Sequence, residues 1–209
     1  MTAPLIETER LRLRDLRETD FAAYAAMCAD PEVMKYLGSG PLSAEDAWRQ
    51  LAMFVGHWAL RGFGMWAVET REGDFAGRVG LHFPHGWPDR ELGWALARTH
   101  WGRGYALEAA TAIRDYAFRD LQWQSLVSYV HPENSRSIRL AERLGARPAG
   151  AIDLRGHRVL VFAHSAGDGG TGRRSELPVT RAATGRTLTG LTNADILRIL
   201  EEEDAARSS

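Results

Sequence analysis

Residues 91–118, ELGWALARTHWGRGYALEAATAIRDYAF, join the pattern of a strand to the pattern of an amphipathic helix through a glycine-containing turn. In 91–96 the bulky apolar residues stand at every second position, which is the period of a strand with one packed face. From Tyr105 onward apolar residues recur at helical spacing, and charged residues take the other side. A turn that leads from a strand into a helix N-terminus is a typical place for a bound anion.

The turn itself is the run Trp101, Gly102, Arg103 and Gly104. Two glycines one residue apart let successive backbone N–H groups face a common point, and the first turn of the helix adds its own unpaired donors. Arg103 would add a charge-assisted donor. We therefore expect a phosphate or diphosphate here, the alternative being a plain strand-to-helix turn that binds nothing.

Two known phosphate-binding motifs do not fit this turn. A dinucleotide fingerprint needs a small residue three places after Gly104, where Leu107 stands, and a Walker loop needs a lysine that is absent. Gly167, Gly169 and Gly172 formally match the dinucleotide pattern, but no apolar helical periodicity follows them. Spacing therefore disfavours a different phosphate-binding enzyme.

Composition narrows the classes of protein. With 209 residues, 44% hydrophobic, the chain is long enough for one good core and an appendage. A formal net charge of -1 gives no general attraction for nucleic acid or anionic membranes. The single cysteine, Cys28, excludes an internal disulfide, and the first residues lack the apolar segment of a signal peptide. We expect a cytoplasmic, soluble protein.

The order of predicted elements suggests a mixed α/β domain over residues 1–164. Strands are predicted over 6–14, 65–70, 75–83, 91–96 and 125–130, with two more between 149 and 164; helices are predicted after Asp20, Pro31, Ser43, Gly104 and Asn134. The composition of 165–190 is that of a flexible linker, and 191–209 contain a plausible amphipathic helix. The tail helix and exposed strands make a homodimer reasonable.

Two helix starts have specific signals. Thr19 and Asp20 can cap the first helix, and Ser43 with Asp46 resembles a capping box. In the helix that follows Ser43, the predicted apolar stripe is Trp48, Leu51, Val55 and Trp58.

Three stretches carry a resemblance to a known family: IETERLRLRDLRETD (6–20), LGWALARTHWGRGYALEA (92–109) and NSRSIRLAERLGA (134–146). Together they resemble the GNAT acetyltransferases, in particular the branch that includes the RimJ/RimL-like ribosomal-protein N-terminal acetyltransferases. The resemblance runs from Ile6 to His164 and implies an α/β fold with a mainly antiparallel central sheet flanked by helices.

The resemblance implies acetyl-CoA as cofactor. The 91–96 strand would pair with the pantetheine arm, and the 101–106 turn would bind the diphosphate. The family usually carries Gln or Arg where this chain has Trp101, so Arg98 or Arg103 could replace a side-chain contact. The expected cofactor-binding residues are Trp94, Ala95, Leu96, Trp101, Gly102, Arg103, Gly104, Tyr105, Ala106 and Asn134.

Acetyl transfer to an amine needs a base, donors for the developing oxyanion and a proton for the leaving thiolate. Glu91 is the first candidate base, directly or through water, unless it is only the partner of Arg90 or Arg98. His82 is the second candidate base, unless it is a satisfied histidine of the core or the cleft. A main-chain N–H within 94–96 would serve the oxyanion.

The resemblance points to Asn134 and Ser137 on the thiolate side. They lie three residues apart at a helix start and share a face, so Ser137 could donate to sulfur while Asn134 binds the pantetheine amide. The alternative for Asn134 is a plain helix cap, although a cap can do both jobs, and Tyr129 is an alternative acid. Trp87, in the loop before Glu91, could form the acceptor pocket with His82.

The expected function is therefore an acetyl-CoA-dependent N-acetyltransferase that moves the acetyl group directly to a primary amine of a protein N-terminus or a small molecule. The alternative from another class is a non-catalytic acyl-CoA-binding or partner-binding module. His82 and His85 lack cysteine or carboxylate companions in the sequence, so no metal site is expected.

Overall fold

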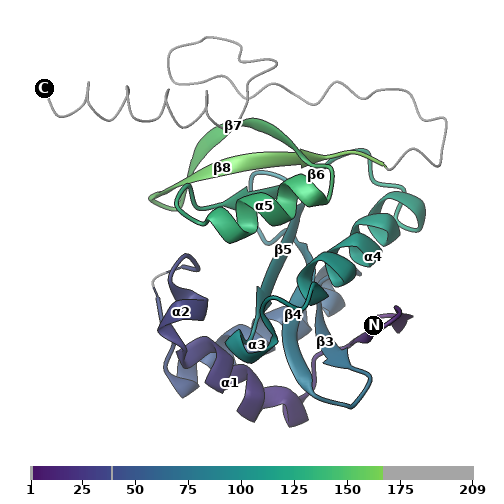
Figure 1. The fold of residues 1–209 in the computed structure, drawn as a ribbon, viewed down its shortest axis with the longest axis vertical. Helices are drawn as coiled ribbons and strands as arrows, with labels where there is room; N and C mark the ends of the chain where they lie inside the picture. Colours follow the sequence, from purple (N-terminus) through teal and green to yellow (C-terminus); the bar gives the residue numbers. More distant parts are fainter. Residues whose placement is uncertain (1, 39, 167–209) are drawn as a thin grey trace, which may run out of the picture. The chain divides into compact units, whose positions relative to one another are not determined.

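The computed structural model describes residues 2–38 and 40–166, and these belong to two compact units that divide between Trp123 and Gln124 (Figure 1). The predicted linker over 165–190 and the tail helix within 191–209 fall almost entirely beyond residue 166, outside the described residues.

The first unit is built on antiparallel strands in sequence order. These are β1 (Ile6–Glu7), β2 (Leu11–Arg14), β3 (Met65–Thr70), β4 (Phe75–His82) and β5 (Glu91–Leu96), each antiparallel to the next. The strands predicted over 65–70, 75–83 and 91–96 are confirmed, and they pair as three successive antiparallel strands. The single strand predicted over 6–14 is instead two short strands, and β2 lies between β1 and β3.

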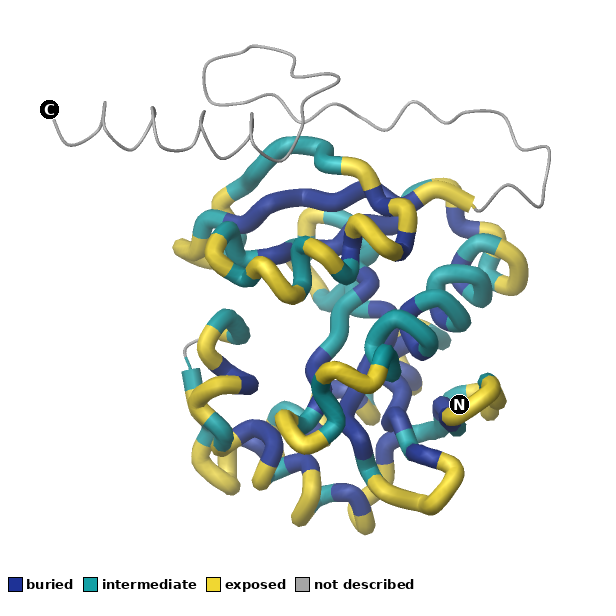
Figure 2. The backbone as a smooth tube through the Cα atoms, in the orientation of Figure 1, coloured by how far each residue is buried: buried dark blue, intermediate teal, exposed yellow. Residues whose placement is uncertain are grey.

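Helices cover both faces of these strands. The helices are α1 (Phe21–Ala29), α2 (Pro31–Met34), α3 (Ala44–Arg61) and α4 (Tyr105–Arg119), with 3-10 helices η1 (Glu18–Asp20) and η2 (Arg98–His100). Side chains of α1, α2 and α3 share a buried cluster with Met65, Ala67 and Ala95 of the strands. On the opposite face α4 packs, where the Tyr116 ring lies 5.5 Å from that of Trp66. The middle strands β3 and β4 are consequently mostly buried, whereas β1 and the outer turns of the helices are more exposed (Figure 2).

Helix α3 shows how the chain sets its own boundaries. The Ser43 side chain accepts a hydrogen bond of 3.1 Å from the Asp46 N–H, and Gly62 ends the helix with a φ of 76°. The predicted stripe was half wrong, because Trp48 and Val55 are 43% and 47% exposed. The buried line is Ala47, Leu51, Phe54 and Trp58.

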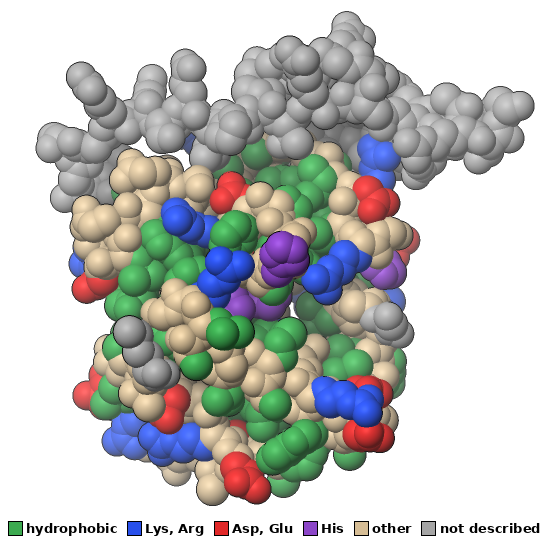
Figure 3. Space-filling model, turned by 180° about the vertical axis from the view of Figure 1, so that it is seen from behind, with side chains coloured by type: hydrophobic (Ala, Val, Ile, Leu, Met, Phe, Trp, Pro, Cys, Tyr) green, Lys and Arg blue, Asp and Glu red, His purple; other side chains and the backbone are tan. Residues whose placement is uncertain are grey.

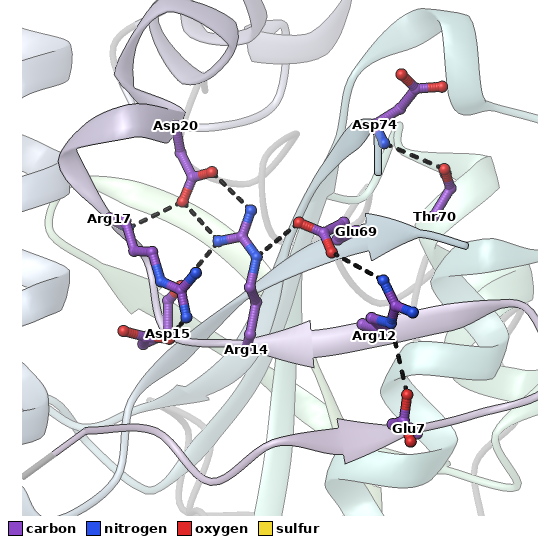
Figure 4. A network of polar contacts seen from close by, with 9 residues as sticks. All are labelled: Glu7, Arg12, Arg14, Asp15, Arg17, Asp20, Glu69, Thr70 and Asp74. Atoms are coloured by element: carbon purple, nitrogen blue, oxygen red, sulfur yellow. Dashed lines mark hydrogen bonds and ion pairs between the residues drawn. The ribbon is translucent and has the colours of Figure 1, made fainter. Parts of the chain in front are cut away.

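A network of charges joins β2 and β3 to the start of α1 (Figure 4). The Arg14 guanidinium binds both carboxylate oxygens of Asp20 at 2.8 Å and Glu69 Oε2 at 2.7 Å. Asp20 also accepts from the Arg17 N–H at 2.9 Å. Asp20 therefore precedes α1 as predicted, but its carboxylate holds Arg14 and makes no side-chain cap bond to α1.

The second unit begins at Gln124. It contains β6 (Leu126–Val130), α5 (Ser135–Arg143), β7 (Arg147–Leu154) and β8 (His157–His164), with β8 paired antiparallel to both β6 and β7. The two strands predicted between 149 and 164 are present, and Arg155 and Gly156 form the turn between them with φ values of 54° and 82°.

The fold class is the expected one, α/β with mainly antiparallel strands flanked by helices. Within the described residues, helices long and apolar enough to cross a bilayer are absent.

Candidate active site

The turn between β5 and α4 has the backbone that the sequence predicts. Gly102 and Gly104 have φ values of 76° and 79°, a left-handed conformation in which other residues are strained. Gly104 is the residue before α4, so the first N–H groups of a helix of 15 residues follow directly. The turn can therefore offer backbone donors and a positive helix end to an anion.

The Trp101 side chain is engaged with the protein itself. Its indole N–H donates to the Leu96 carbonyl at 2.8 Å, and the ring packs against the core cluster. Trp101 thus ties the turn to the end of β5. Of the two arginines expected to replace a polar side chain here, Arg98 pairs with Asp30 at 3.1 Å, whereas Arg103 is exposed at the turn.

Arg10, in the turn between β1 and β2, braces the same turn from behind. Its Nη1 donates to the Arg103 carbonyl at 2.8 Å, and its Nε donates to Glu108 Oε2 at 2.7 Å. Thr8 and the Arg10 N–H both donate to Glu108 Oε1, at 2.6 and 2.8 Å. Sequence reasoning missed this brace, because the residues lie about a hundred positions apart and nothing in their local pattern pairs them.

Burial alone would raise the pKa of Glu108. The hydrogen bonds from Thr8 and Arg10 outweigh burial and lower the pKa below its usual 4.5. Glu108 is therefore a charged anchor at the first turn of α4, where the helix dipole also favours a carboxylate.

Glu91, His82 and Trp87 come together at the other end of β5. Glu91 and His82 are direct partners across the β4–β5 pair, so their side chains share a face of the sheet. The Trp87 indole donates to Glu91 Oε2 at 2.8 Å, and its ring meets the His82 ring edge-on at 5.1 Å. The candidate base and the two expected pocket residues thus form one cluster.

His57 of α3, which sequence reasoning did not single out, fixes the back of this cluster. Its Nδ1 lies 2.7 Å from the Phe63 carbonyl, and its Nε2 lies 3.1 Å from the Phe83 N–H. A carbonyl only accepts and an N–H only donates, so the proton is on Nδ1. The His57 ring stacks on His82 at 5.5 Å and holds it in place.

The two arginines considered as partners of Glu91 have other contacts. Arg98 pairs with Asp30, and the Arg90 guanidinium lies 4.7 Å from the centre of the Trp123 ring. One partner of the Glu91 carboxylate is the indole N–H of Trp87.

The residues expected on the thiolate side belong to the second unit. Asn134 caps α5, where its Oδ1 accepts from the Ser137 N–H at 3.1 Å. The cap is confirmed and leaves the Asn134 side-chain N–H donors for another partner. Tyr129 lies on β6 opposite Val161. The roles of Asn134, Ser137 and Tyr129 in catalysis stay predictions.

Two further observations concern the charged side chains on the surface and the groups that could hold a metal ion. On the face drawn in Figure 3, some Lys and Arg side chains lie beside Asp and Glu, and others lie around a His side chain near the middle of the face. In the described part of the chain, groups of three or more His, Cys, Asp or Glu residues placed to hold a metal ion are absent.

A strand that leads into a left-handed glycine turn at a helix start is an arrangement that can hold an anion. The family model "Acetyltransferase (GNAT) domain" matches residues 10–147. The chain belongs to the GNAT acetyltransferase family and is an N-acetyltransferase.

Similar proteins support this assignment. The uncharacterized N-acetyltransferase p20 of Bacillus licheniformis is 32% identical over 150 residues, which is 69% of this chain and 83% of p20. The crystal structure of the acetyltransferase from Agrobacterium tumefaciens str. C58 is 36% identical, covers 79% of this chain and 96% of its own, and has a TM-score of 0.72. Mycobacterium smegmatis RimJ in complex with CoA-disulfide shares the fold at a TM-score of 0.64 and 18% identity, over 79% of this chain and 87% of its own.

Proposed function

We propose that this enzyme transfers an acetyl group from acetyl-CoA to a primary amine. The observation that carries the proposal is the pair of left-handed glycines, Gly102 and Gly104, at the start of α4 and directly after the strand that bears Glu91. A turn of this kind suits a diphosphate because its donors are backbone groups that need no rearrangement. RimJ, whose fold this chain shares, is a protein solved with a CoA derivative.

The residues of the turn fit such a group. Both glycines leave the mouth of the turn free of side chains, and a Cβ on Gly104 would lie 3.3 Å from Arg10 Nη2. Backbone donors of 102–106 would hold the diphosphate, with Arg103 as a charged supplement. The main-chain groups of Trp94, Ala95 and Leu96 would hold the pantetheine arm.

The chemistry assigns a task to each remaining residue. When bound, acetyl-CoA supplies the acetyl group as a thioester, whose C–S bond breaks as the amide bond to the amine forms. Glu91 takes the proton from the amine, and Trp87 orients the Glu91 carboxylate through its 2.8 Å hydrogen bond. An N–H of 94–96 stabilises the oxyanion, while Ser137 gives a proton to sulfur and Asn134 holds the pantetheine amide.

The acceptor in this proposal is a protein N-terminus or a small-molecule amine. We further propose a cytoplasmic location and a homodimer, which size-exclusion chromatography with light scattering would test.

Release of free thiol from acetyl-CoA, measured over a panel of amines and N-terminal peptides, tests the function. We expect release that depends on the amine, together with a rise in melting temperature on addition of acetyl-CoA. A melting shift without thiol release from any amine would favour the non-catalytic acyl-CoA-binding module instead.

Glu91→Gln tests the base. We expect kcat to fall by about 100-fold or more, the usual size of a general-base contribution, with the acetyl-CoA melting shift unchanged. Glu45→Gln, an exposed carboxylate on α3, is the matched control and should keep full activity. Wild-type turnover in the Glu91 variant would remove Glu91 as the base.

A further inference from the structure

Arg78, in the middle of β4, is a buried cation without an anion. It is 8% exposed and forms no ion pair with a carboxylate of the described residues. Its Nη1 lies 3.8 Å from the Met65 sulfur, its guanidinium lies 4.7 Å from the centre of the Phe54 ring, and its Nε is buried without a hydrogen-bond partner.

The contrast with Arg14 shows what is missing. Arg14 is similarly enclosed, at 13% side-chain exposure, but it binds the carboxylates of both Asp20 and Glu69. An arginine keeps its charge at any accessible pH, and an unpaired buried charge costs several kcal/mol. A position such as Arg78 is therefore expected to have a partner.

The polar neighbours of Arg78 do not supply a negative charge. Burial raises the pKa of both the Tyr24 hydroxyl and the Cys28 thiol, against the opposing effect of the Arg78 charge. Both groups are therefore neutral near pH 7. The Tyr24 hydroxyl donates a hydrogen bond to Gln50 Oε1. The counter-charge has to come from outside the described residues.

Arg78 faces the strip of sheet that leads to Glu91. The register pairs His82 with Glu91, then Gly80 with Gly93, then Arg78 with Ala95, and these three rows share one face. The middle row has no side chains, so nothing from β4 or β5 stands between the two charged ends. Phe54 touches both ends, because its ring also lies 5.7 Å from that of His82.

Met65 covers the bare row. Its Cε would lie 3.4 Å from a Cβ built on Gly93, and Glu91 Oε1 would lie 3.5 Å from that same Cβ. Main chain closes the Gly80 side of the row, because a Cβ there would lie 2.5 Å from the Gly64 carbonyl oxygen and from the Met65 Cα. A ligand on this strip would therefore occupy the Gly93 side, where it would displace the unbranched and adaptable Met65 side chain.

We propose that Arg78 binds a carboxylate of the acceptor, so that the substrate is a primary amine that also carries a carboxylate group. This inference rests on the proposed acetyl transfer, in which Glu91 receives the amine. Four residues of strand span roughly 13 Å between Cα atoms, and two long side chains shorten that span to the size of an amino acid or a short peptide end. The carboxylate belongs either to a free amino acid or to an acidic side chain next to a protein N-terminus.

Matched pairs of acceptors test the inference with the intact enzyme. Glycine against methylamine, and β-alanine against propylamine, differ chiefly in the carboxylate; peptides with Asp or Ala at the second position form the protein arm. In one of the two sets, small amines or peptides, we expect kcat/KM to be at least about tenfold higher for the acceptor with the carboxylate. The acceptor without it cannot form the charge-assisted hydrogen bonds with Arg78. The arm that shows the preference identifies the source of the carboxylate.

Arg78→Met should remove this preference through KM for the acceptor, with the acetyl-CoA melting shift unchanged. Its urea midpoint should equal or exceed that of the wild type, because a buried unpaired charge has been replaced by an apolar side chain. Arg78→Lys keeps the charge without the planar fork and should retain part of the preference. Leu60→Met, an exposed change on α3, is the control.

Three outcomes overturn the inference. Thiol release without preference for carboxylate-bearing amines refutes the inference alone, and so does a preference that survives Arg78→Met. An Arg78→Met protein that fails to fold, or unfolds at lower urea, assigns Arg78 to structure unless Arg78→Lys folds and shows a preference that is reduced but not abolished. Absence of thiol release with every amine refutes the acetyl transfer itself.

Discussion

Asp20 shows how much one carboxylate can hold. It is 5% exposed, binds Arg14 through both oxygens, and accepts from the Arg17 N–H, while Glu69 takes the remaining side of Arg14 (Figure 4). The hydrogen bond from Arg14 to Asp20, with that to Glu69, raises the pKa of Arg14 despite burial. Asp20 and Glu69 together neutralise the enclosed Arg14, so both carboxylates are needed for the network to stabilise the folded state.

Asp20→Asn should destabilise the protein by about 3–5 kcal/mol, because it leaves Arg14 enclosed with one partner removed. Urea unfolding followed by fluorescence measures the change. Arg49→Ala, which breaks an exposed pair on α3 at 66% and 73% exposure, should cost less than about 0.5 kcal/mol. Equal effects of the two substitutions would contradict the role given to the Asp20 network.

The sequence alone did not predict which partners such charged side chains contact. Asp20 was correctly placed before α1, but a cap and a buried ion pair need the same residue type, and only the fold brings Arg14 within reach. Arg78 gave no signal at all, because an arginine in an alternating strand is usually on the exposed face. Arg10 stood within a recognised stretch, yet its contact with the Arg103 carbonyl depends on how β1 and β2 lie against α4.

At the scale of elements, the turn before α4 depends on the left-handed backbone conformation of Gly102 and Gly104. Gly104→Val should abolish the melting shift caused by acetyl-CoA, because a φ of 79° is strained for a β-branched residue and the new Cβ meets Arg10. Differential scanning fluorimetry with and without acetyl-CoA measures the shift.

Gly73→Val is the matched control for that variant. Gly73 also has a positive φ, 96°, in the β3–β4 turn, and a Cβ there meets nothing within 4 Å. The control should lower the melting temperature but keep the acetyl-CoA shift. A Gly104 variant that keeps a full shift would sink the diphosphate assignment.

Periodicity predicted most elements well and one face poorly. The β5 strand and the starts of α3, α4 and α5 carried strong local signals, namely alternation, a serine cap, a glycine and an asparagine cap. In α3, large residues repeat on two adjacent lines. The predicted apolar stripe included Trp48, which is 43% exposed and contacts the Phe21 ring edge-on, and it left out the buried Phe54. Which of the two lines is buried depends on the strands and helices that pack against α3, and the sequence of the helix does not reveal them.

At the scale of the whole molecule, we expect protonation of Glu108 to reduce the stability of the fold at low pH. Its pKa is lower in the folded state than in the unfolded state, so its contribution is complete above the unfolded pKa and is lost as pH falls through the folded pKa. Glu108→Gln should therefore destabilise by about 1 kcal/mol at pH 7, after allowance for screening at Arg10, which is 45% exposed.

The measurement for Glu108 is urea unfolding from pH 7 to pH 3. The difference between wild type and Glu108→Gln should shrink below the usual carboxylate pKa of 4.5. A difference that stays constant or grows on acidification would contradict the ionised anchor. Glu45→Gln should show little difference at any pH, since Glu45 is exposed.

The predicted domain boundary can be tested by truncation after His164. The last described strand, β8, ends there, and the family match ends at residue 147. The shortened chain should keep the acetyl-CoA melting shift and its thiol release. Loss of both with a folded circular dichroism spectrum would give residues 165–209 a part in the site and overturn the boundary at 164.

The Trp101 indole, joined to the Leu96 carbonyl between β5 and the two glycines, gives the molecule a built-in optical reporter. An indole is a fluorophore whose emission depends on the polarity of its surroundings. The Trp101 indole lies between β5, proposed to bind the pantetheine arm, and the 102–106 turn, proposed to bind the diphosphate. Among the seven tryptophans of the chain, its signal can be isolated by subtracting the spectrum of Trp101→Phe. Occupancy of the turn can thus be followed by light in the unlabelled protein, in real time.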